Sequence, residues 1–274
     1  MIETDPAARV ARAKAYPFAI PGRSYLYVNG DSHELAAHGA CPVADGVLDH
    51  ADGPRSAPEH LADAGIEAGP GIEGRIPVIA CGSNQAPDQL RRKFAPLSGD
   101  VVIPVSQCRL VDFDAVYSAH FSRYGSIAAT LQHSPGTTVT LMVTWLTPDQ
   151  LGHMHGTEAR GENYAYACLD GLVLALDGGA VLDAVYAYTS LHGALTRTGR
   201  PVALRAITAK GRAFDALDQP AVQAHVRDRL APEDELDDFI LANIDDMDLR
   251  RVRTMTLRAD AAGLDWGGHE IIEN

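Results

Sequence analysis

The sequence lacks a long apolar run. No stretch in the 274 residues approaches the roughly 20 consecutive apolar residues that a membrane-spanning helix needs. The first residues, Met1 to Asp5, are acidic and lack the apolar centre of a secretory signal peptide. We therefore expect a cytoplasmic protein that makes no membrane contact.

Basic residues are also scarce. Lys and Arg number 23 against 36 Asp and Glu, which gives a formal net charge of −13. Such a surface repels phosphate backbones and anionic lipids, so we expect no nucleic-acid partner.

Cysteine is limited to Cys41, Cys81, Cys108 and Cys168, without a Cys-x-x-Cys pair, and this favours reduced thiols.

Residues 76–94 are the most informative stretch that is present. The apolar run 76–80 predicts a buried strand, Gly82 to Asn84 interrupt it, and Pro87 opens a predicted helix. A strand that ends in a glycine turn before a helix points several backbone N–H groups at one spot. The helix dipole favours an anion there, such as a substrate carboxylate. The same pattern also occurs in an ordinary strand–turn–helix connection.

Three short motifs follow one another in residues 121–168. They are Tyr124-Gly125-Ser126 before Ala129-Thr130-Leu131, Ser134-Pro135-Gly136 before an alternating stretch, and Thr157-Glu158 before Tyr164. Together with Cys81-Gly82-Ser83-Asn84, and in this order, they resemble the γ-glutamylcyclotransferase-like family. That family has a Tyr-Gly-Ser-Asn loop, a Gly-Gly-x-Ala-Thr…Ser-Pro-Gly stretch and a Glu-Gly-x…Tyr segment with the catalytic glutamate. The resemblance covers about residues 75–190.

The resemblance implies an α+β fold, a small mixed β-barrel with flanking helices and a cavity at one end. It implies Glu158 as the catalytic general acid/base. The residues that it implies for substrate binding are Cys81, Gly82, Ser83, Asn84 and Tyr164. The expected substrate is a small molecule with a carboxylate, and the family chemistry calls for no cofactor and no metal.

The chain departs from the family pattern at several positions. Cys81 stands where the family loop has tyrosine, and Tyr124 replaces one glycine of the Gly-Gly pair. Leu141 occupies the place of a glycine often found in the strand after Ser-Pro-Gly. These departures bear on the identity of the substrate more than on the fold.

We expect the chain to be organised in three parts. Residues 1–74 form an N-terminal extension wrapping the core, 75–190 the barrel, and 191–274 a helical C-terminal extension packed on the core. Within the first part, residues 36–74 are dominated by Ala, Gly, Asp and Pro and predict a long loop or lid-like segment, with a short helix at 57–64.

Hydrophobic patterning predicts the remaining elements. Strands are expected near 76–81, 101–105, 108–117, 125–131, 138–146, 163–170 and 183–189, with 24–28 also extended. Helices are expected near 7–16, 86–94, 147–153, 219–230 and 232–243, with 245–257 a charged connector or helix.

Glu158 is the main candidate for chemistry. Facing the 82–84 turn, its carboxylate could take a proton from the α-amine of a γ-glutamyl substrate while that amine attacks the γ-amide carbonyl, and then pass the proton to the leaving nitrogen. Because the attack is intramolecular, one carboxylate plus backbone donors for the oxyanion could suffice. The expected products are 5-oxoproline and an amine. An amidase, an acyl-transfer enzyme and a non-catalytic small-molecule binding module remain alternatives, as does a surface glutamate.

Other residues offer competing chemistry. Cys81 lies where a strand ends and a helix begins, a place that lowers thiol pKa values, although a small buried residue is the simpler interpretation. As a nucleophile it would need a histidine base, for which the candidates are His120, His133, His153 and His155. The pair His153 and His155 also suggests a metal site, but the spacing implies no third ligand. Arg123 and Arg160 could bind a second substrate carboxylate or lie on the surface.

Overall fold

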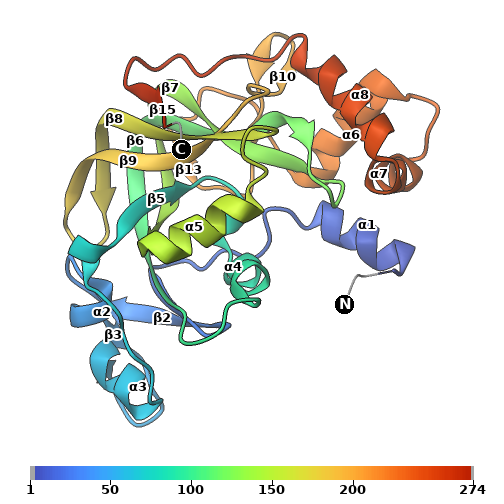
Figure 1. Ribbon diagram of the computed structural model, residues 1–274. Coiled ribbons are helices and arrows are strands. Elements are labelled where there is room, and N and C mark those ends of the chain that lie inside the picture. The colour runs from blue at the N-terminus through green and yellow to red at the C-terminus, as the bar shows by residue number, and fades with distance from the viewer. Residues whose placement is uncertain (1–3, 273–274) are drawn as a thin grey trace.

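The computed structural model describes residues 4–272, and a closed barrel lies at its centre. Its five strands are β5 (Ile76–Ala80), β6 (Val102–Phe121), β7 (Ile127–Leu146), β8 (Tyr164–Leu176) and β9 (Val181–Ser190). They pair in the order β6-β7-β5-β9-β8, and β8 pairs back with β6, which closes the ring (Figure 1). The β5–β9 pair is parallel and the other pairs of the ring are antiparallel. The predicted α+β fold with a mixed barrel is confirmed.

Strands β6 and β7 each run through a region where the sequence predicted two separate strands. Their register shifts at Asp112, whose φ of 62° lies in the left-handed region, and opposite it Gly136 has a φ of 81°. The Gly136 N–H donates to the Asp112 carboxylate at 2.7 Å. Pro135, which has no N–H for the ladder, is tolerated at such an irregularity. The Ser-Pro-Gly motif therefore bends a strand and does not reverse the chain.

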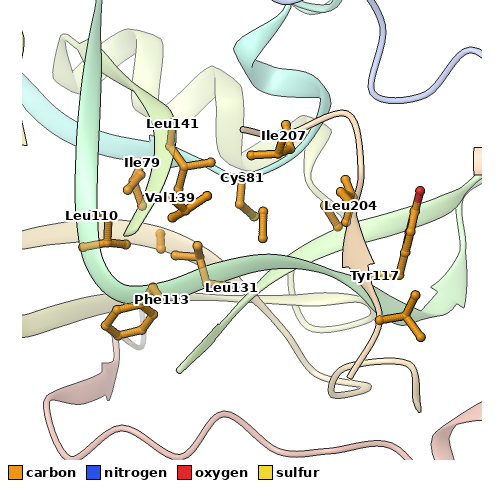
Figure 2. Close-up of a cluster of buried hydrophobic side chains, with 14 of the residues drawn as sticks. Ile79, Cys81, Leu110, Phe113, Tyr117, Leu131, Val139, Leu141, Leu204 and Ile207 are labelled. Atoms are coloured by element: carbon orange, nitrogen blue, oxygen red, sulfur yellow. The ribbon is translucent and has the colours of Figure 1, made fainter. Parts of the chain in front are cut away.

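Inward-facing side chains fill the barrel (Figure 2). Val139 and Leu141 of β7 alternate with outward-facing residues, and they meet Ile79 of β5 and Leu131 from the first half of β7 in one buried cluster. Cys81 belongs to the same cluster, because the chain leaves β5 while still inside the ring. The wall of the barrel next to the end of β5 is thus held by apolar packing.

Two helices cover one outer side of the barrel. They are α4 (Pro87–Phe94) and α5 (Pro148–Thr157), which pack together through Leu90 and Met154 in a second buried cluster. Helix α5 continues beyond the predicted end at 153, so Glu158 is its C-terminal cap residue. The end of α5 and the last turn of α4 therefore lie side by side.

From Tyr25 onward, the N-terminal segment folds beside β6. Strand β1 pairs with β6 and β2, and short elements follow with an apolar cluster of their own. These elements are β1 (Tyr25–Val28), β2 (Asp31–Ala37), α2 (Pro42–Asp45), β3 (Val47–Leu48), β4 (Arg55–Ser56) and α3 (Ala57–Asp63). The long loop predicted for 36–74 is thus a folded layer, and none of these residues lines the pocket described below. The expectation of a lid was wrong.

The segment after the barrel combines short strands with helices. The strands are β10 (Thr196–Arg197), β11 (Arg200–Pro201), β12 (Ala203–Leu204), β13 (Ala209–Lys210), β14 (Ala216–Leu217) and β15 (His269–Ile271). The helices are α6 (Gln219–Leu230), α7 (Leu236–Asp245) and α8 (Met247–Arg258), and the N-terminal α1 (Pro6–Lys14) packs on α7 (Figure 1). Among residues 4–272, no helix has the length and apolarity to cross a membrane.

Arg75 ties strands β6 and β7 of the barrel to residues 68–70 and to helix α5. Its side chain is buried, at 6% exposure, and its guanidinium donates to five acceptors at 3.0–3.2 Å. They are the carbonyls of Ala68, Pro70, Val102 and Trp145 and the side chain of Gln150. Because no carboxylate takes part, the contact depends on the planar fork of donors, which lysine cannot reproduce.

We therefore expect Arg75→Lys to lower the free energy of unfolding by about 2–4 kcal/mol, since several buried carbonyls lose their donor while the charge is kept. Urea unfolding of the purified protein measures this loss. Arg109→Lys is the matched control, because the Arg109 side chain is 59% exposed. Equal stability of the two variants would show that the hydrogen bonds of the Arg75 guanidinium contribute nothing to stability.

Candidate functional site

A pocket of about 710 Å³ opens where β5 ends. Its walls come from the turn after β5, helices α4 and α5, the starts of β7 and β8, and the N-terminal segment. All the site residues predicted from the sequence line it, namely Cys81, Gly82, Ser83, Asn84, Glu158 and Tyr164. The structure thus gathers in one cavity residues that are far apart in the chain.

The turn after β5 lines the pocket with residues whose N–H groups make no backbone hydrogen bond in the part of the chain that the structure describes. A short 3₁₀ turn, Ser83–Gln85, connects the strand to α4, and the N–H groups of Gln85 and Ala86 bond back to Gly82 and Ser83. Within residues 4–272, the N–H groups of Gly82, Ser83 and Asn84 have no backbone acceptor. Such a row of free N–H groups is suited to binding an anion.

Gly82 is required at this turn by close approach. A Cβ built at Gly82 would lie 2.1 Å from the hydroxyl oxygen of Tyr16 and 2.9 Å from the Cβ of Ala129. The first contact is far inside van der Waals range, so any larger residue would displace the Tyr16 ring. The glycine therefore allows a side chain from outside the barrel to reach the turn.

The Glu158 carboxylate faces this turn and is held by one of its two oxygens. Oε1 accepts a hydrogen bond from Asn84 Nδ2 at 2.7 Å and forms an ion pair with Lys93 Nζ. The side chains of Lys93 and Glu158 are only 8% and 10% exposed. No donor to Oε2 is found in the described chain. The carboxylate is thus fixed in place with one oxygen left to meet a ligand.

Lys93 was missed as a site residue at the sequence level. It belongs to a basic triplet, Arg91 to Lys93, which is ordinary for the last turn of a helix. Nothing local indicates that the third of these side chains turns inward, away from Arg91, to reach the end of α5. The inward direction of the Lys93 side chain depends on the packing of α4 on α5, which the sequence does not reveal.

Tyrosines form much of the remaining wall. The Tyr164 hydroxyl donates to the carbonyl of Ala129 at 3.1 Å. The N–H of Ala129 donates to the Tyr16 hydroxyl at 2.8 Å. Burial raises the pKa of both phenols well above the usual value, so both are protonated at neutral pH. Tyr124 and Tyr188 also line the pocket. Tyr16 was not predicted, since it lies in the N-terminal extension without a recognisable motif.

The thiol of Cys81 does not fit the role of nucleophile. Its side chain packs in the barrel core, and burial raises its pKa to about 12. Of the candidate bases, His120 and His153 line the pocket; burial lowers the pKa of His120 to about 3, and His153 Nε2 lies 2.6 Å from the Lys93 carbonyl. A thiol that stays protonated at neutral pH is a poor nucleophile. The interpretation of Cys81 as a space-filling residue is the one that this packing favours.

The two histidines considered as metal ligands point to different partners. Both lie on α5, where residues two apart face nearly opposite sides. His153 Nε2 lies 2.6 Å from the Lys93 carbonyl, and His155 Nδ1 lies 2.8 Å from the Tyr188 hydroxyl. Over residues 4–272, no group of three His, Cys, Asp or Glu residues is placed to hold a metal ion.

The two arginines considered for a second carboxylate also differ. Arg123 lines the pocket, whereas Arg160 is not part of its wall and lies over the Tyr166 ring, 6.0 Å from the ring centre. Arg92, next to Lys93 on α4, lines the pocket as well. The pocket therefore carries positive charge in a protein whose formal net charge is −13.

No family model and no curated protein matches this chain. Among solved structures, it is similar to one titled gamma-glutamyl cyclotransferase, with 15% identity, a TM-score of 0.34, and coverage of 73% of this chain and 94% of the other. It is similar to an uncharacterized protein from Homo sapiens, with 15% identity, a TM-score of 0.34, and coverage of 73% and 95%. The name of the first is that of the family which the sequence motifs resemble.

The Lys93–Glu158 pair generates a stability prediction. Glu158→Gln leaves a poorly exposed ammonium without its counter-ion, so we expect the free energy of unfolding to fall by about 2 kcal/mol, less than for a fully buried pair because water enters the pocket. Lys93→Met combined with Glu158→Gln removes the unpaired charge and should recover most of the loss. Chemical denaturation of the single and double variants measures both effects. A double variant as unstable as Glu158→Gln alone would contradict the ion pair.

Proposed function

We propose that this protein is an enzyme that acts on a γ-glutamyl or related small amide, with Glu158 as general acid/base, and that it releases 5-oxoproline and an amine. The observation that carries the proposal is the Glu158 carboxylate, which Oε1 fixes to Asn84 and Lys93 in the same pocket as the 82–84 turn, whose N–H groups make no backbone hydrogen bond within the described residues. One anion-binding surface and one available base thus share a pocket.

In the proposed reaction the substrate supplies its own nucleophile. The α-amine nitrogen forms a bond to the γ-carbonyl carbon, and Glu158 Oε2 accepts the proton that this nitrogen loses. The carbonyl oxygen takes the negative charge, which donors at the turn stabilise. The bond from the γ-carbonyl carbon to the amide nitrogen then breaks, and Glu158 returns the proton to that nitrogen. The products together contain the same atoms as the substrate, so no water is consumed.

The charges of the pocket support a substrate with a carboxylate. Lys93 is engaged by Glu158, whereas Arg92 and Arg123 line the pocket without any ion pair to a described carboxylate. The free N–H groups of the turn add partial positive charge. An anionic head group would therefore gain favourable interactions that a neutral amide would not.

The test is to incubate the purified protein with a panel of γ-glutamyl amines and γ-glutamyl dipeptides and to assay 5-oxoproline and free amine together. Both products should appear in equal amounts. Free glutamate without 5-oxoproline would indicate hydrolysis and thus the amidase alternative. Ligand binding without any product would indicate the non-catalytic module.

Loss of basicity at residue 158 should abolish most of this turnover. We expect Glu158→Gln to lower kcat by about 10²-fold or more, because the glutamine amide cannot carry the proton. The Lys93→Met/Glu158→Gln double variant should be equally inactive while it remains folded, which separates catalysis from stability. Cys81→Ser is the comparison variant and should retain activity. Full activity of Glu158→Gln, with loss in Cys81→Ser, would overturn the assignment.

A further inference from the structure

The N-terminal extension places a phenol in the pocket. Tyr16 follows α1 and reaches the turn after β5, where its hydroxyl occupies the space that a side chain at position 82 would take. The residue lines the pocket and is 6% exposed. Its position is thus determined by two backbone contacts inside the barrel, at Gly82 and at Ala129.

The hydrogen bonds around this phenol leave its proton free. The Tyr16 oxygen accepts the N–H of Ala129 at 2.8 Å, and within the described chain its own proton makes no hydrogen bond. By contrast, the Tyr164 hydroxyl donates its proton to the carbonyl of Ala129. Of these two buried phenols, Tyr16 is therefore the one that can donate to a ligand.

The contacts of α1 show how strongly the arm that carries Tyr16 is held. Val10 and Ala13 pack against Ile240 of α7, and Arg9 and Lys14 form ion pairs with that helix. The Ala13 carbonyl accepts a hydrogen bond from the Ser126 hydroxyl at 3.1 Å, next to the start of β7. The arm is therefore clamped between the C-terminal helices and the barrel.

Aromatic contacts fix the segment on both sides of Tyr16. The Arg12 guanidinium lies 5.1 Å from the Phe18 ring centre and 5.0 Å from that of Tyr124, a residue of the pocket wall. The Tyr16 and Phe18 rings meet edge to face at 6.2 Å. These contacts leave the ring of Tyr16 little freedom to leave the pocket, so its hydroxyl is preorganised.

We propose that Tyr16 is a catalytic residue that donates its phenolic hydrogen bond to the amide oxygen of the substrate as that oxygen gains negative charge. This inference rests on the proposed function. Tyr16 keeps its proton throughout the reaction and acts beside the backbone donors of the turn. The two extensions then have a common task, because the C-terminal helix α7 anchors the arm that delivers this donor.

Tyr16→Phe tests the proposal, since it keeps the ring and removes the hydroxyl. We expect kcat for 5-oxoproline release to fall by about 10²-fold with little change in KM, as for the loss of one donor to an oxyanion. Tyr117→Phe is the matched control. Tyr117 is 1% exposed and its hydroxyl also bonds to backbone, at Leu217, but it lies outside the pocket wall. Unchanged kcat in Tyr16→Phe would overturn the proposal.

A binding measurement tests this inference separately from the reaction. If the wild-type protein releases no 5-oxoproline, the proposed function fails, and calorimetric titration with 5-oxoproline then tests Tyr16 alone. Weakening of its affinity by about 5-fold in Tyr16→Phe, but not in Tyr117→Phe, would support Tyr16 as a ligand donor. Equal affinities, or no binding to the wild type, would overturn it.

A labelled residue covers the case in which Tyr16→Phe does not fold. 3-Fluorotyrosine at position 16 keeps the hydroxyl and its contact with Ala129. Its ¹⁹F resonance should shift when 5-oxoproline is added, whereas 3-fluorotyrosine at position 117 should not respond. An unshifted resonance at position 16 at saturating 5-oxoproline would overturn the proposal.

Discussion

The site depends on where one short strand stops inside a closed ring. Strand β5 ends at Ala80, while its parallel neighbour β9 continues to Ser190. The antiparallel neighbour β7 pairs with Ala80 at Met142, and the rest of β7, back to Ile127, extends past the end of β5. In a closed barrel every strand has two partners, so a strand that ends early leaves N–H groups without a ladder. The turn at 82–84 lines the pocket, and its N–H groups make no backbone hydrogen bond with any other described residue.

The parts of the fold that could be predicted are those encoded locally. The apolar run of β5, the glycine turn and the proline that opens α4 are adjacent in sequence, and their order alone defines the local geometry. The sequence pointed to Glu158, which lines the pocket, because a motif marks it. By contrast, Lys93 and Tyr16 reach the pocket through tertiary packing, one across the α4–α5 contact and the other through an arm that precedes the barrel.

The errors also have physical causes. The composition of residues 36–74 predicts a loop, yet Val43, Leu48 and Leu61, spaced widely along the chain, are enough to form a buried cluster with Leu26 of β1. Composition averages over a segment, whereas a core needs only a few apolar residues at the right places. For β7, the turn residues Ser134-Pro135-Gly136 were taken as the end of a strand, but the long strand uses them to bend around the barrel.

Because Tyr16 belongs to an arm that contributes no strand to the ring, this wall of the pocket is structurally separable from the barrel. Substitutions in the arm alter the shape and polarity near the turn without shifting the register of any β-ladder. The reverse holds for Ala129, which is itself a barrel residue paired with Tyr117 of β6. A protein built in this way can diverge in ligand preference through its first twenty or so residues while its scaffold stays under the constraints of barrel closure.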